Sequence, residues 1–224
     1  MKLDNSKNYV PLLAVRIKDG GRNQEARQVP LSYRIIKKLF DIVVSILLLP
    51  VFIIGSLLLV VANPFLNRGP LFFIQSRMGW DCTRFNAIKF RTMTCTNEIG
   101  RGAHDPLEVD RITLLGGFLR KARLDEIPQI INVLRGEMSL IGPRPDSYDH
   151  ATTYVELIPG YRERHAVLPG ITGLAQTEVG YVHGVDGTRM KVAADLYYIQ
   201  NQSAHLDTWI FWRTLQTVAG RAGA

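Results

Sequence analysis

The side chains best suited to catalysis in this sequence belong to two adjacent acids, Asp125 and Glu126. A carboxylate can attack phosphorus, and it can hold a divalent cation such as Mg²⁺ that neutralises the phosphates it approaches. Neighbouring side chains diverge on a helix, so spacing alone does not make the acids converge on one atom. At a helix N-terminus both reach the space above the first turn, although acids there commonly only complement the helix dipole. The pair therefore needs support from its surroundings.

Basic residues that suit phosphate groups lie on both sides of the pair. Lys89 and Arg91 alternate with apolar residues, so we expect both on one face of an extended segment. Arg120 and Arg123 precede the acids, and Arg144 stands between two prolines, where a stiff turn loses little entropy when a guanidinium binds phosphate. Cations gathered around two acids are what a metal-assisted, diphosphate-cleaving site needs. For any one of them alone, a solvated surface of mixed charge is the alternative.

A helix is expected to carry the two acids. Apolar residues recur at helical spacing from Leu124 to Leu134, and Gly136 is a natural stop. Pro128 is tolerated only in the first turn of such a helix. This places the acids close to the helix N-terminus.

The neighbouring segments predict short elements. Residues 69–93 are rich in β-favouring side chains and predict an extended hairpin that turns at Trp80-Asp81. Residues 94–110 and the segment around Pro169-Gly170 predict loops. The chain from Lys191 onward predicts helix. Its aromatic side chains suit either a membrane interface or ordinary core packing: Trp209, Phe211 and Trp212, beside Arg213.

An uncharged run from Ile42 to Ala62 is long enough to enter a lipid bilayer. Pro50 lies near its middle and removes a backbone donor, which predicts a sharp bend at this point. The hydroxyls of Ser45 and Ser56 are candidates to bind the carbonyls that the proline leaves free.

Lysine and arginine flank this run on both sides, and short segments rich in these residues stay cytoplasmic. A complete crossing would export one flank, whereas a re-entrant hairpin of two half-helices leaves both in the cytosol. We therefore expect the hairpin, with an ordinary transmembrane anchor and a buried core helix as alternatives. The basic flanks comprise Arg16, Lys18, Arg22, Arg27, Arg34, Lys37 and Lys38 before the run, and Arg68, Arg77, Arg84, Lys89 and Arg91 after it.

Composition fits a protein on an anionic membrane surface. The net charge is +7 and the pI about 9.6, which suits an anionic leaflet and a phosphorylated substrate. The basic residues are dispersed rather than striped with aromatic residues, which argues against nucleic acid binding. Cys82 and Cys95 lack CxxC spacing and fit a reducing compartment. No signal-peptide pattern precedes the apolar run, and no P-loop, GxGxxG or GxSxG motif occurs.

In their order along the chain, these segments resemble the bacterial sugar transferase family, the monotopic phosphoglycosyl transferases. The resemblance covers nearly everything after residue 33, and the run from Arg120 to Pro145 is highly specific for it. The matching stretches are KKLFDIVVSILLLPVF at 37–52, GPLFFIQSRMG at 69–79, KFRTM at 89–93, LLGGFLRKARLDEIPQIINVLRGEMSLIGPRP at 114–145, PGITGLAQ at 169–176 and KVAADLYYIQNQSAHLDTWIFWRTL at 191–215.

The resemblance implies a reaction at the cytoplasmic face of the bacterial inner membrane. A UDP-sugar donates its sugar-1-phosphate to undecaprenyl phosphate, UMP leaves, and a covalent phospho-sugar enzyme lies between the two steps. Downstream glycosyltransferases would then extend an exopolysaccharide or a related glycan. By match to the family motifs, the roles fall on these residues: Asp125 as nucleophile, Glu126 as Mg²⁺ ligand, Lys89, Arg91, Arg120 and Arg144 as phosphate-binding residues, and Pro50 as the hairpin break with Ser45 nearby.

The expected architecture is an α+β fold in three parts. A tail (1–33) leads into a re-entrant helix-break-helix (34–66), which packs beside a small, mainly helical catalytic domain (67–224) with a short β-hairpin and interfacial amphipathic helices. Leu49 stands before the break where the family often has serine, so the carbonyl repair must come from elsewhere.

The alternatives are an inactive membrane-anchored scaffold, which the intact acids and Arg144 oppose, and direct attack by the lipid phosphate in a ternary complex. Replacement of Asp125 separates the covalent from the direct route. A hexose such as galactose or glucose is favoured, and a homodimer through the soluble domain stays open.

Overall fold

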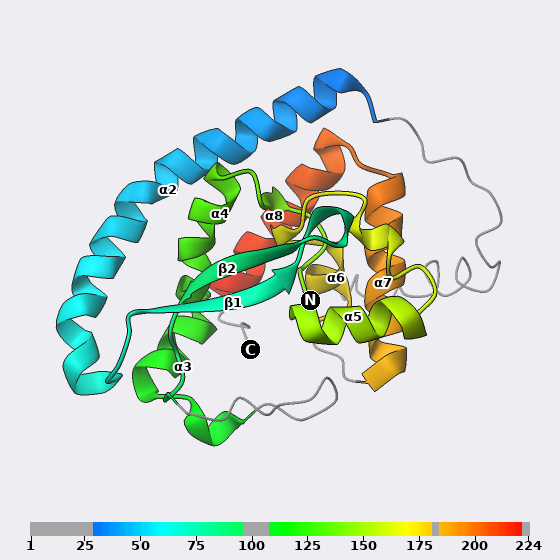
Figure 1. Ribbon diagram of the computed structural model, residues 1–224. Helices are drawn as coiled ribbons and strands as arrows, with labels where there is room; N and C mark the ends of the chain where they lie inside the picture. The colour runs from blue at the N-terminus through cyan, green and yellow to red at the C-terminus, as the bar shows by residue number, and fades with distance from the viewer. Residues whose placement is uncertain (1–28, 96–107, 181–183, 221–224) are drawn as a thin grey trace, which may run out of the picture.

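The computed structural model describes residues 29–95, 108–180 and 184–220 of the chain. One long helix, α2, arches along the outside of a body made of shorter helices and two small sheets (Figure 1). Most of the predicted tail and of the predicted loop at 94–110 lies outside the described residues. The elements in order are α2 (Leu31–Leu66), β1 (Phe72–Met78), η2 (Trp80–Cys82), β2 (Arg84–Phe90), η3 (Val109–Arg111), α3 (Leu114–Lys121), η4 (Leu124–Gln129), α4 (Ile130–Leu134), β3 (Ser139–Ile141), α5 (Tyr148–Leu157), η5 (Glu163–His165), β4 (Gly170–Thr172), α6 (Leu174–Glu178), α7 (Gly184–Gln200) and α8 (Ala204–Ala219).

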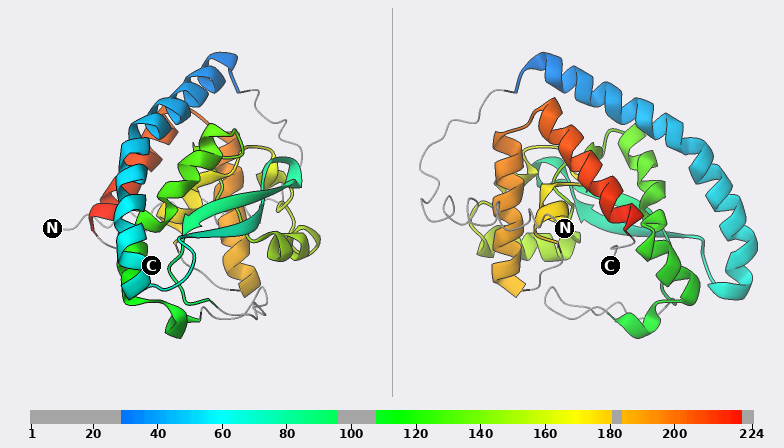
Figure 2. Two further views of the ribbon diagram at one scale, coloured as in Figure 1. Left: turned by 60° about the vertical axis from the view of Figure 1, so that its left-hand side comes forward. Right: turned by 180° about the vertical axis from the view of Figure 1, so that it is seen from behind.

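Helix α2 is continuous over 36 residues and contains Pro50. The sequence predicted two half-helices with a break at this proline. The helix instead bends in its middle part and continues (Figure 2). A proline removes one backbone hydrogen bond and clashes with the preceding turn, which bends a helix without ending it when the other bonds persist. By length and composition, α2 can cross a membrane.

The predicted repair of the proline site by serine hydroxyls is wrong. Pro50 frees the carbonyl of Ile46, four residues earlier. Ser56 Oγ donates to the carbonyl of Phe52, 2.7 Å away, within its own turn. Ser45 is fully buried, and its hydroxyl has no hydrogen-bond partner among the described residues. Neither serine therefore satisfies the freed carbonyl.

Polar side chains attach α2 to the body, while most of its apolar side chains are exposed. Asp41 accepts a hydrogen bond from the backbone amide of Leu140, 3.0 Å away. Lys37 forms an ion pair with Asp207 at 2.9 Å, and Tyr33 donates to the same carboxylate. The apolar surface of α2 is thus left to face something other than the protein body.

The predicted hairpin is confirmed: β1 and β2 pair antiparallel, with Phe73 opposite Lys89. The loop predicted around Pro169-Gly170 is only partly confirmed, because it ends at Pro169, and β4 begins at Gly170 and pairs in parallel with β3. A Cβ at Gly170 would lie 2.2 Å from the amide nitrogen of Gly142. Only glycine lets the backbones approach this closely, and glycine carries no strand signal.

Helices α7 and α8 confirm the helical pattern predicted after Lys191, with a short interruption between them. They pack on the buried core around Met138, Ile141, Tyr198 and Ile210. Phe211 packs edge-on against Phe40 of α2, and Trp212 is exposed, so the aromatic residues divide between packing and surface.

Candidate active site

Asp125 and Glu126 lie in the first turn of η4, as predicted. Arg123 adopts a left-handed conformation (φ 53°) just before this helix and redirects the chain. The element is a 3₁₀ helix that passes through Pro128 into α4. With about three residues per turn, adjacent side chains diverge strongly, and the two acids accordingly have different surroundings.

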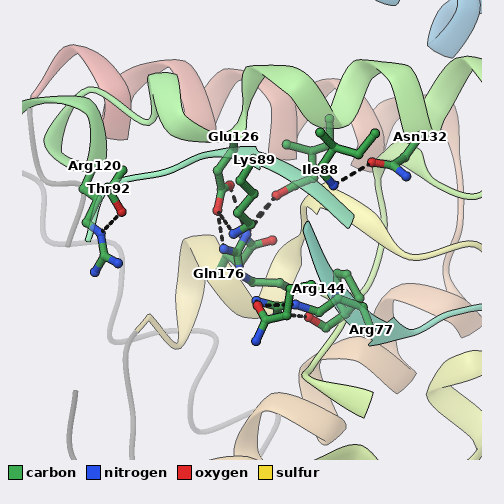
Figure 3. A network of polar contacts seen from close by, with 12 residues as sticks. Arg77, Ile88, Lys89, Thr92, Arg120, Glu126, Asn132, Arg144 and Gln176 are labelled. Atoms are coloured by element: carbon green, nitrogen blue, oxygen red, sulfur yellow. Dashed lines mark hydrogen bonds and ion pairs between the residues drawn. The ribbon is translucent and has the colours of Figure 1, made fainter. Parts of the chain in front are cut away.

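Glu126 is buried and held by two cations from distant segments (Figure 3). Lys89 of β2 contacts its Oε1 at 3.0 Å. Arg144, from the loop after β3, donates to Oε2 at 3.1 Å and also to Oε1. Burial alone would raise the pKa of Glu126, but Arg144 and Lys89 outweigh it and hold the pKa well below its usual range. Glu126 is therefore a carboxylate at neutral pH.

The pKa of Lys89 is shifted toward neutral pH. Burial lowers its pKa to about 8, although the charge of Glu126 opposes this change, while Arg144 and Arg77 reinforce it. At neutral pH Lys89 therefore still carries its charge, which it loses as the pH rises through about 8. The site thus has an excess of positive charge that a phosphate can neutralise.

Asp125 is partly buried and makes no hydrogen bond or ion pair with another described residue. Burial and the neighbouring charge of Glu126 raise its pKa, and Lys89, Arg120 and Arg144 partly offset this increase. An unpaired carboxylate next to a set of cations is free to form a bond to an incoming electrophile.

The other two predicted phosphate-binding residues lie apart from Glu126. Arg120 donates from Nε to the hydroxyl of Thr92 at 2.8 Å, at some distance from the Glu126 cluster in Figure 3. Arg91 does not share the position of Lys89, because β2 ends at Phe90. Its buried guanidinium binds Asn67 and the carbonyls of Pro70 and Met93, so it anchors the end of α2 instead.

Two further residues that the sequence reasoning missed belong to the cluster. Arg77 of β1 donates to Gln75 Oε1 at 2.6 Å and to the carbonyl of Pro145. Burial and the nearby Arg144 lower the pKa of Arg77 to about 10. Gln176 donates to the carbonyl of Ile171 at 3.1 Å, which also accepts from Arg144. For Arg77, the available sequence signal was its alternation with Gln75 along a predicted strand, which places both side chains on one face.

The acids suit a divalent cation that is shared with a substrate. The described residues contain no group of three or more His, Cys, Asp or Glu that could hold a metal by themselves. Mg²⁺ commonly takes one or two carboxylates and completes its shell with substrate phosphates and water. Asp125 accepts no bond from the described residues, and Glu126 is ionised, with its Oε2 bonded to Arg144 and its Oε1 to both Arg144 and Lys89. The donor set therefore fits Mg²⁺ bound together with a diphosphate.

Comparison with known proteins finds several similar proteins. The chain is 40% identical over 193 residues to the "UDP-N-acetylgalactosamine-undecaprenyl-phosphate N-acetylgalactosaminephosphotransferase" of Aeromonas hydrophila, covering 86% of this chain and 45% of that protein. It is 40% identical to the "UDP-glucose:undecaprenyl-phosphate glucose-1-phosphate transferase" of Caulobacter vibrioides, covering 81% and 66%. It is 36% identical to the "Exopolysaccharide production protein PSS" of Rhizobium leguminosarum bv. phaseoli, covering 81% and 94%.

The chain thus spans less than two thirds of the first two relatives, and nearly all of the third. The family model described as "Bacterial sugar transferase" matches residues 32–221. This range contains every residue of the site described above. The chain belongs to the bacterial sugar transferase family.

Proposed function

We propose that this protein transfers a sugar-1-phosphate from a UDP-sugar to undecaprenyl phosphate and releases UMP, as the first membrane step of exopolysaccharide or related glycan synthesis. The names of two relatives support both substrates, and the name of a third supports a role in exopolysaccharide production. The observation that carries the proposal is the unpaired carboxylate of Asp125 beside Glu126, which Lys89 and Arg144 hold.

Asp125 is the proposed nucleophile. One of its carboxylate oxygens forms a bond to the β-phosphorus of the donor, the bond from that phosphorus to the bridging oxygen breaks, and UMP leaves with this oxygen. An oxygen of undecaprenyl phosphate then attacks the same phosphorus and releases the Asp125 carboxylate. Two sequential exchanges replace one crowded encounter of three molecules. Asp125 must be ionised for the attack, and the charges of Lys89, Arg120 and Arg144 favour the ionised form against burial and Glu126.

Lys89 and Arg144 are the proposed phosphate-binding residues. In the absence of the donor they neutralise Glu126. When a diphosphate arrives, their charges are shared with its oxygens, and the guanidinium fork of Arg144 suits two of them. Glu126 would hold Mg²⁺, which when bound neutralises the donor phosphates and stabilises the leaving group. Arg120 contributes charge from a greater distance.

The membrane position is proposed from α2. Its apolar side chains are largely exposed, so a bilayer is a suitable environment for them. Basic residues at both ends favour a re-entrant course, with both ends and the catalytic domain on the cytoplasmic face of the bacterial inner membrane. The bend at Pro50 would turn the helix within the bilayer. Exposed Trp212 and Leu215 of α8 suit the interface.

The donor sugar and the route of attack complete the proposal. The donor sugar is a hexose such as glucose or galactose, although one relative is named for N-acetylgalactosamine. Direct attack by the lipid phosphate, with Asp125 in a supporting role, is the competing route.

Intact-protein mass spectrometry tests the proposal. The detergent-purified protein is incubated with Mg²⁺ and single UDP-sugars, without lipid. We expect a mass gain equal to one sugar phosphate, and no gain in Asp125→Asn. Asp149→Asn makes the same chemical change at an exposed position and should retain the adduct. UMP release upon addition of undecaprenyl phosphate, without any adduct, would support direct attack. If no donor of the panel gave either an adduct or UMP, that result would contradict the transferase function.

A further inference from the structure

The loop that carries Arg144 is held at four consecutive carbonyls. The carbonyl of Pro143 accepts from the amide of Gly170 at 2.8 Å, and that of Asp146 from the amide of Met78 at 3.1 Å. Between them, side chains of two arginines bind the carbonyls of Arg144 and Pro145: Arg164 and Arg77, respectively. Such complete satisfaction fixes the backbone from which the Arg144 side chain departs.

Arg164 makes the most extensive of these contacts. Its Nη2 donates to the carbonyl of Arg144 at 2.7 Å, and its Nη1 donates to the carboxylate of Asp146, two residues further along. The same Nη2 lies 2.7 Å from Asp195 of α7. One guanidinium thus ties the loop to a long helix that does not otherwise belong to the site.

Arg164 is enclosed by the protein. Arg164 is 3% exposed, and its guanidinium lies 5.0 Å from the ring centre of Tyr161. The Tyr161 hydroxyl donates to Asp146 at 2.7 Å. Burial would raise the pKa of Asp146, but Arg164 and this hydroxyl lower it to about 2. Asp146 is therefore ionised throughout the ordinary pH range, whereas burial raises the pKa of Asp195 to about 6 against the opposing charge of Arg164.

We propose that Arg164 is a positioning residue for donor binding, which acts through Arg144 by fixing the loop that aims its guanidinium at the diphosphate. This inference rests on the proposed function, because it assumes that Arg144 binds donor phosphates. Arg164 itself does not touch the substrate. Lysine cannot replace it, since an ammonium group lacks the planar fork that reaches the Arg144 carbonyl and Asp146 at once.

The test is a double-mutant cycle in equilibrium binding. UDP with Mg²⁺ is titrated calorimetrically into the detergent-purified full chain. We expect Arg164→Lys to weaken UDP binding about tenfold in the presence of Arg144, the effect of one lost charged hydrogen bond. In an Arg144→Ala background, the same change should alter the dissociation constant by less than about twofold, because the side chain that it positions is gone.

Arg91→Lys is the matched control. Arg91 is also a buried arginine with several hydrogen bonds, but it binds the end of α2 rather than the Arg144 loop. Its replacement should lower the unfolding temperature and change UDP binding by the same factor in both backgrounds. Tyr161→Phe is a milder second variant, which removes one hydrogen bond to Asp146 and should show the same dependence on Arg144 at a smaller size.

The outcomes separate this inference from the proposed function. If Arg164→Lys weakens binding equally with and without Arg144, or if a folded Arg164→Lys or Tyr161→Phe protein binds UDP as the wild type does, the positioning role is overturned. If the wild type itself binds no UDP, the proposed donor is wrong, whatever the cycle shows.

Discussion

Arg144 and Glu126 are 18 positions apart in the chain, and two nitrogens of the Arg144 guanidinium meet both carboxylate oxygens of Glu126. Lys89 reaches the same carboxylate from β2. Buried charges of this kind persist only when they are paired and hydrogen-bonded. The pairing therefore keeps Glu126 ionised and keeps two cations in place beside the open carboxylate of Asp125.

Glu126→Gln tests whether this acid is a metal ligand. A neutral amide binds Mg²⁺ more weakly than a carboxylate does. We expect the Mg²⁺ concentration for half-maximal adduct formation to rise at least about tenfold, which corresponds to about 1.4 kcal/mol. The measurement is adduct formation by mass spectrometry over a Mg²⁺ titration.

Glu178→Gln is the control for this variant, because Glu178 is another buried glutamate in an ion pair, with Arg213. Both changes should lower the unfolding temperature, since each removes the charged partner of an arginine. An equal shift in the Mg²⁺ requirement of both variants would show that the effect is structural and that Glu126 holds no metal.

Lys89 should limit activity at high pH. Its pKa of about 8 means that it loses its charge as the pH rises through this value in the free enzyme. The ratio kcat/KM for the donor should therefore fall above pH 8. Arginine stays charged in this range, so Lys89→Arg should remove the decline, although its maximal rate will be lower. Lys121→Arg, at an exposed position, should leave the wild-type profile unchanged.

Lys89 should also make the stability of the folded protein depend on pH. The folded-state pKa lies below the ordinary value of 10.5, so the folded protein binds fewer protons than the unfolded chain between about pH 8 and 10.5. The contribution of Lys89 to stability consequently rises with pH across this window. Urea unfolding at both ends of the window should show a larger rise in the wild type than in Lys89→Arg. A parallel pH dependence in both proteins would contradict the assigned shift.

Local pattern predicted the elements that carry the site, but not all of the contacts between them. Alternation in residues 69–93 gave the hairpin, and Pro128 placed the start of the helix before the acids. Each of these signals acts within a few residues. The contact of Arg144 with Glu126 depends on the pairing of β3 with β4, and β4 was missed because Gly170 has no strand propensity.

The failure at Arg91 has the same origin. Period-two alternation predicted that the Arg91 side chain would point to the same side as that of Lys89. This rule holds only inside a strand. The strand ends one residue earlier, and Asn67 at the end of α2 offers acceptors nearby. Tertiary packing decides which segment a buried arginine pairs with. A single sequence does not show which segments lie close together in the fold.

Asp41 should matter for stability more than its place in an apolar helix suggests. Its carboxylate accepts from the buried amide of Leu140, at the start of the segment that leads to Arg144. Asp41→Ala leaves this amide unsatisfied, which costs about 1–3 kcal/mol. Ser56→Ala removes only a bond within one turn of α2 and should cost less than about 0.5 kcal/mol. Chemical unfolding in detergent measures both; equal losses would contradict the docking role of Asp41.

The re-entrant course of α2 predicts that both of its ends lie in the cytosol. Single-cysteine variants can report this: native Cys95, which is exposed, with Cys82→Ser, and Ser32→Cys in a background without the native cysteines. A membrane-impermeant maleimide should label neither site in intact spheroplasts and both after lysis. Labelling of one site before lysis would instead establish a complete crossing.

Adjacent glycines in α3 should respond in opposite ways to alanine. A Cβ at Gly116 would lie 2.0 Å from the carbonyl oxygen of Thr92, whereas one at Gly117 would meet nothing closer than a methyl group 4.0 Å away. Gly116→Ala must therefore push α3 away from Thr92, at a cost of about 1–3 kcal/mol. The same displacement breaks the bond from Arg120 to the Thr92 hydroxyl, so donor affinity should fall as well.

Gly117→Ala should instead gain up to about 1 kcal/mol, because alanine is favoured over glycine inside a helix. Chemical unfolding of the two variants, together with UDP titrations, makes the comparison at neighbouring positions of one helix. If both variants were equally stable, the close packing of α3 on Thr92 would be wrong. If Gly116→Ala lost stability but bound UDP normally, Arg120 would have no part in donor binding, and its charge would serve the fold alone.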